Sequence, residues 1–118
     1  MVTVADVVTQ LGLNVVTAGV SLEGTVTGGY TSDLLSCVMA GAQVGNVWVT
    51  LQSHSNVVAV ASLLGLSCVI VAEGNAIEQS TIEKAEQEGI PILSSAIDSF
   101  SIVERLCELG IRGNDRSK

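Results

Sequence analysis

Residues 34–72 include no Asp, Glu, Lys or Arg, and this charge-free stretch constrains the fold more than any other feature of the sequence. A helix that spans a membrane needs about 20 continuous apolar residues. Here the apolar runs are interrupted by Gly45, by the polar segment 52–56 and by Gly65. The stretch therefore predicts a buried strand–helix–strand unit, and we expect no contact with a membrane.

The core must be built from aliphatic side chains, because 47% of the 118 residues are apolar but only one Trp, one Tyr and one Phe occur. Val is the commonest of these aliphatic residues, and β-branched residues favour buried strands that are covered by helices. Helical and strand patterns alternate along the chain, which predicts a single α/β domain: a mainly parallel β-sheet flanked by helices in three layers.

The predicted helices and strands follow from apolar periodicity and from the polar or Gly residues at their ends. The predicted helices cover residues 4–11, 32–42, 56–64, about 78–88 and about 99–109, and the predicted strands cover residues 13–18, 25–28, 47–51, 68–72 and 90–93. We expect the domain to span residues 1–110 and a flexible tail to follow over residues 111–118.

Charge and cysteine usage exclude several classes of function. All five basic residues follow position 83 and the net charge is −7, whereas nucleic-acid binding needs Lys and Arg side chains against phosphates. We therefore expect no nucleic-acid partner. Cys37, Cys68 and Cys107 are widely spaced in apolar contexts, which predicts reduced thiols in a cytoplasmic protein and no metal site. No secretory signal is expected either, because no basic segment precedes an apolar run at the amino terminus.

The predicted helix over residues 56–64 is apolar on every side. A helix of this kind is usually buried on more than one face. A domain of this size supplies few layers to bury it, so we expect a partner chain to provide one and the protein to be a homodimer.

Two polar segments, residues 28–33 and 52–56, follow predicted strands. The carboxyl ends of parallel strands meet at one edge of a sheet, where open α/β folds bind their ligands. We therefore expect a site there for a small ligand, a nucleotide or an anion, with no further cofactor. The candidate ligand-binding residues are Gly28, Gly29, Thr31, Ser32, Asp33, Gln52, His54 and Asn56.

The first of these segments has two interpretations. Thr31 or Ser32 can cap a helix whose free N–H groups bind an anion. Alternatively, Gly28 and Gly29 only make a turn and Asp33 complements the helix dipole. The G-x-x-x-x-G-K-[ST] loop is absent, so the chain has no lysine loop for terminal phosphates and is not a kinase by itself.

His54, the single histidine, also has two interpretations. It can bind a ligand or transfer a proton, or it can be a loop residue that caps or packs. A Ser–His–Asp triad lacks the G-x-S-x-G elbow, and one His without clustered carboxylates does not make a metal site. No catalytic residue is assigned, and a small hydrolase or transferase that uses His54 with Asp33 is the alternative.

Two motifs carry a family resemblance: a T-S-D-L-L run that begins at Thr31 and a Q-x-H-x-N-x-x-A-V-A run that begins at Gln52. With their surroundings, residues 26–36 and 48–61, and with residues 90–93, they resemble the DRTGG domain family over nearly the whole chain. The chain departs from the motif that names the family, since no Asp-Arg pair precedes residues 25–29.

The resemblance implies a small α/β domain of the kind found alone or joined to CBS domains in family II pyrophosphatases and to phosphotransacetylases. It also implies a fold related to the amino-terminal domain of HPr kinase/phosphorylase. The implied function is a homodimeric regulatory, ligand-sensing or interaction module, and stand-alone members tend to accompany iron-hydrogenase genes. A pure dimerisation module, in which the two polar segments only cap helices, is a further alternative.

Overall fold

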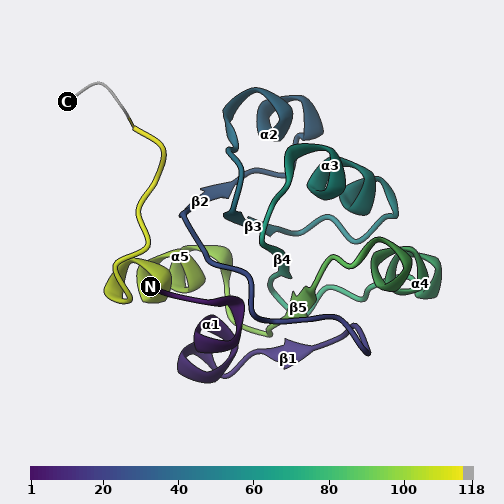
Figure 1. The fold of residues 1–118 in the computed structure, drawn as a ribbon, viewed down its shortest axis with the longest axis horizontal. Coiled ribbons are helices and arrows are strands. Elements are labelled where there is room, and N and C mark those ends of the chain that lie inside the picture. The colour runs from purple at the N-terminus through teal and green to yellow at the C-terminus, as the bar shows by residue number, and fades with distance from the viewer. Residues whose placement is uncertain (116–118) are drawn as a thin grey trace.

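The structure, a computed structural model, describes residues 1–115 and contains five helices and one five-stranded sheet in that part of the chain (Figure 1). The helices are α1 (Val4–Leu11), α2 (Leu35–Gly41), α3 (Asn56–Leu64), α4 (Gln79–Glu88) and α5 (Ser99–Glu108). The strands are β1 (Asn14–Val15), β2 (Gly28–Thr31), β3 (Asn46–Thr50), β4 (Cys68–Val71) and β5 (Ile92–Ser94).

The sheet has the strand order β1-β5-β4-β3-β2. The pairs from β2 to β5 are parallel, and only β1 runs antiparallel to its neighbour β5. Helices α2, α3 and α4 lie on one face of the sheet and α1 and α5 lie on the other (Figure 1). The predicted α/β domain with a mainly parallel sheet between helical layers is thus confirmed.

The two central strands account for part of the charge-free stretch between residues 34 and 72. Every residue of β3 and β4 is buried. On β3, Val47 and Val49 join the core beneath α1 and α5, whereas Trp48 joins the core beneath α2, α3 and α4. Strands covered on both faces have no position where a charged side chain could reach water.

Local sequence signals set several helix ends as predicted. Thr3 caps α1, and its hydroxyl accepts a hydrogen bond from the Asp6 N–H while the Asp6 carboxylate accepts one from the Thr3 N–H. Hydrogen bonding of the Asp6 carboxylate by the Thr3 backbone N–H, and secondarily by the Thr3 side chain, holds the pKa of Asp6 below its ordinary value. Asp98 caps α5 and accepts hydrogen bonds from the hydroxyl and N–H of Ser101, which likewise lower the pKa of Asp98.

Strand β2 and helix α2 correct the sequence analysis. The predicted strand ended at Gly28, but Gly28 and Gly29 lie inside β2. A Cβ atom on Gly28 would lie 2.8 Å from the carbonyl oxygen of Arg112, so this glycine permits a close approach of two chain segments and does not make a turn. Helix α2 begins at Leu35 without a side-chain cap, and the predicted cap Thr31 belongs to β2. Ser32, the other predicted cap, lies before the helix, and its hydroxyl accepts a hydrogen bond from the Leu34 N–H.

The segment after α5 is a second correction, because its first residues pack on the domain and do not form a tail. Ile111 is buried, and the carbonyl of Arg112 accepts a hydrogen bond of 2.9 Å from the Gly29 N–H. The Asn114 side chain donates to the Gly41 carbonyl and to the Asn46 side chain. The rest of the predicted tail, residues 116–118, lies outside the described residues.

Candidate functional site

The turns that follow β2 and β3 lie at the same edge of the sheet, because these strands are parallel neighbours. One oxygen of the Asp33 carboxylate accepts hydrogen bonds from the Thr50 hydroxyl at 2.8 Å and from the Leu51 N–H at 2.7 Å. The Gln52 side chain donates to the Asp33 carbonyl at 2.8 Å. The structure thus brings Asp33 and Gln52 together, as the sequence analysis expected for the two polar segments.

Further hydrogen bonds tie the end of β2 and the turn after it to β3, so this turn has a structural role. The Trp48 indole N–H donates to the Ser32 carbonyl at 2.9 Å, and the Thr31 hydroxyl donates to the Val49 carbonyl at 2.8 Å. Asp33 does not sit in the first turn of α2, where it would complement the helix dipole, and its carboxylate ties the β2 turn to the end of β3 instead. Many of the polar groups that were expected to bind a ligand therefore already form hydrogen bonds within the protein.

His54 and Asn56 lie at the same edge, and both side chains are exposed. Asn56 is the first residue of α3 and not its cap, which is Ser55, and its N–H donates to His54 Nδ1 at 3.3 Å. Asp33 and His54 share no hydrogen bond within residues 1–115, so the structure does not assemble the hydrolytic pair. In the same part of the chain, no cluster of three or more His, Cys, Asp or Glu side chains could hold a metal ion.

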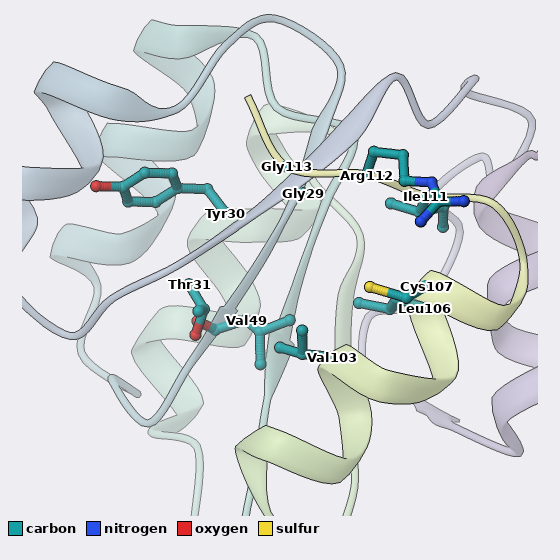
Figure 2. A pocket seen from close by; sticks show the side chains of 10 residues that line it. All are labelled: Gly29, Tyr30, Thr31, Val49, Val103, Leu106, Cys107, Ile111, Arg112 and Gly113. Carbon is teal, nitrogen blue, oxygen red and sulfur yellow. The ribbon is translucent and has the colours of Figure 1, made fainter. Parts of the chain in front are cut away.

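The remaining candidate residues border a different feature, a cavity of about 190 Å³ between β2 and α5. We call it the β2/α5 cavity. Gly29 and Thr31 of β2, Val49 of β3, Val103 and Cys107 of α5, and Arg112 are among the residues that line it (Figure 2). The sequence had predicted a helix over about residues 99–109 and a tail that includes Arg112, and no local signal distinguishes a cavity wall from ordinary core. Gly28 lies beside this wall in β2 but does not line the cavity.

Membrane insertion has no support among the helices. Every helix within residues 1–115 falls short of the length and apolar character that crossing a membrane requires.

Comparison with known proteins identifies a family and finds likenesses among solved structures. The family model of the DRTGG domain matches residues 6–109. The chain also superposes, with a TM-score of 0.68 and 12% identity, on the crystal structure of the CBS and DRTGG domains of the regulatory region of Clostridium perfringens pyrophosphatase, complexed with its activator diadenosine tetraphosphate. The match covers 96% of this chain and 51% of that chain, so this chain spans about half of that length. At this identity the likeness shows the fold alone, and no curated protein matches the sequence.

Proposed function

Since this chain belongs to the DRTGG domain family, we propose that it is a non-catalytic regulatory module that works as a homodimer and pairs through the outward surface of α2 and α3. The observation that carries the proposal is the exposed apolar character of this surface in a protein with a net charge of −7. The exposed residues Leu34, Met39, Val44, Ala59 and Leu63 define what we call the α2/α3 face.

The α2/α3 face is more apolar than a solvated helical surface needs to be. Val44 is 74% exposed and Leu63 is 71% exposed. Helices α2 and α3 pack side by side (Figure 1), and Val44 lies beside Gly65 at the end of α3. Exposed apolar side chains that gather on one part of a surface are typical of interaction sites, and we infer that the residues of the α2/α3 face do so. The domain buries one side of α3, and a partner would bury the apolar side chains that remain exposed on its other side.

Helices α4 and α5, unlike α2 and α3, carry charged side chains on their outward surfaces. The outward positions of α4 include Glu83 and Lys84, and those of α5 include Glu104 and Arg105.

A second copy of the chain is the partner that this charge pattern favours. Two copies with a net charge of −7 repel each other wherever acidic groups meet. The α2/α3 face has no acidic residue of its own, and Asp33 and Glu88 lie at its border. A two-fold interface needs one self-complementary patch, which an uncharged apolar surface provides.

The test of the dimer is the molar mass in solution, measured by sedimentation equilibrium at micromolar concentrations. We expect the wild type to be a dimer and Leu63→Glu to be a monomer with an unchanged circular-dichroism spectrum. The substitution places a carboxylate in the interface of both copies, whereas in the isolated domain this side chain is mostly in water.

Phe100→Glu is the matched control for this experiment. Phe100 is 84% exposed but lies on α5, on the opposite face of the sheet. We expect this variant to remain a dimer. A monomeric wild type would refute the homodimer, and a dimer that survives Leu63→Glu but is lost in Phe100→Glu would move the interface to α5.

A ligand-sensing role at the edge turns is the second part of the proposal. Gln52 is hydrogen-bonded to Asp33 there, and His54 and Asn56 follow it in the chain with exposed side chains, which supports a site where His54 contacts a nucleotide or an anion. The likeness to a pyrophosphatase regulatory region that was crystallised with a dinucleotide activator supports this ligand class.

The three thiols are all unpaired, which supports a cytoplasmic location.

A further inference from the structure

The walls of the β2/α5 cavity are apolar. Val49, Leu106 and Ile111 are buried behind its surface, and Val103 is half-buried. Two lining residues carry hydroxyls: that of Thr31 already donates to a carbonyl of β3, and that of Tyr30 lies beside Gly41 of α2, away from the cavity. Figure 2 shows these side chains from β2, β3 and α5 around a common space. A molecule bound there would therefore need an apolar body.

Arg112 provides a charge at this apolar space. It is the only basic residue among the described residues that line the cavity. Its backbone is held on β2 by the hydrogen bond from the Gly29 N–H, and buried Ile111 precedes it. Gly28 makes this approach possible, because a Cβ atom there would collide with the Arg112 carbonyl. The guanidinium is thus attached to a fixed stretch of backbone beside the cavity.

We propose that the β2/α5 cavity binds a small organic monocarboxylate, whose apolar body fills the cavity and whose carboxylate pairs with the Arg112 guanidinium. A dry apolar cavity of about 150 Å³ accepts benzene, so a cavity of about 190 Å³ suits a ring or branched chain with a short substituent. The cavity would enclose only part of a nucleotide. The net charge of −7 disfavours anions with several charges. This site is separate from the edge turns and from the α2/α3 face, so it stands or falls independently of them.

The cysteines provide a direct measurement of occupancy. Cys107 is exposed and lines the cavity, whereas Cys37 is exposed on α2, on the other face of the sheet. Burial raises the pKa of Cys68 to about 12, so this thiol stays protonated and unreactive in the folded protein. Alkylation by iodoacetamide, followed by peptide mass spectrometry, gives the ratio of the Cys107 and Cys37 rates. The ratio is measured in the Leu63→Glu variant as well as in the wild type, because a second copy paired at α2 and α3 could cover Cys37. We expect millimolar phenylacetate, indole-3-acetate or 4-methylpentanoate to lower this ratio severalfold.

Variants of the lining residues test the two parts of the proposal. Arg112→Gln removes the charge but keeps the backbone carbonyl, so we expect phenylacetate to bind at least about tenfold more weakly, the effect of one charge-assisted hydrogen bond. The neutral analogue phenylacetamide should bind the wild type and this variant equally. Val103→Phe fills the cavity and should abolish protection of Cys107. Arg105→Gln, also on α5 but outside this cavity, is the matched control and should bind as the wild type does.

Two results would overturn the proposal. One is an unchanged ratio of alkylation rates with all three carboxylates. The other is protection of Cys107 that persists in Val103→Phe, since the probe would then act from elsewhere. If phenylacetamide protects wild-type Cys107 as well as phenylacetate does, the cavity binds apolar bodies without the Arg112 pairing, which refutes the carboxylate assignment.

Discussion

Replacing Trp48 with Ala is expected to lower the free energy of unfolding by about 3–5 kcal/mol, the usual cost of removing a large aromatic side chain from a core. Trp48 has no exposed surface and is the largest of the fully buried side chains. It fills the layer between β3 and the helices α2, α3 and α4. Because small domains have a total stability of about 5–15 kcal/mol, a large share of the variant should be unfolded in mild urea. Urea unfolding followed by circular dichroism measures this loss.

Trp48→Phe separates packing from hydrogen bonding in this prediction. It keeps an aromatic ring but removes the indole N–H, which donates to the Ser32 carbonyl in the turn after β2. An unpaired carbonyl costs about 1–3 kcal/mol if no water reaches it, so we expect an intermediate stability. If both variants lose the same stability, the hydrogen bond and not the packing would be the main contribution. If Trp48→Ala unfolds like the wild type, the described core is wrong.

Replacing Asp33 with Ala should cost about 2 kcal/mol of stability, because two hydrogen bonds to a charged acceptor are lost at once. The Thr50 hydroxyl, which is buried, loses the acceptor for its proton, and the Leu51 N–H loses its partner. The exposure of the Asp33 carboxylate keeps the expected cost at the lower end of the range for such bonds. Thermal or urea unfolding of the variant measures the effect.

His54→Ala is the matched variant on the neighbouring turn, and it should change stability by less than about 0.5 kcal/mol. Its side chain is exposed, and the one hydrogen bond that it accepts is a long contact with the Asn56 N–H. The two variants therefore separate structural from ligand-binding roles. In a thermal-shift screen with nucleotides, acyl phosphates and simple anions, the ligand role predicts a wild-type shift that is lost in His54→Ala. No shift with any of these compounds would contradict a ligand at the edge turns and leave Asp33 as a structural residue.

Structures that depend on neighbours in the chain could be predicted from the sequence. The apolar run between the polar segment 52–56 and Gly65 predicted α3 with its observed bounds, because the residues that begin and end a helix are its neighbours in the chain. The residues of β4 were located from a short apolar run. For α5 the sequence left Asp98 or Ser99 as the residue that opens the helix, and the structure shows that Asp98 is the cap. The charge-free stretch also led to buried central strands, since a charge has no place in a strand covered on both faces.

What depends on contacts between distant segments was decided by the tertiary structure. A Gly-Gly pair suits a turn or a close approach equally well, and only the position of Arg112 shows that Gly28 permits an approach. Asp33 looked like a helix-terminal residue because its partner, Thr50, belongs to another strand. The β2/α5 cavity arises where three elements fail to fill the space between them. Periodicity reports which side of an element faces inward, but a void depends on the volumes of side chains that meet from separate parts of the chain.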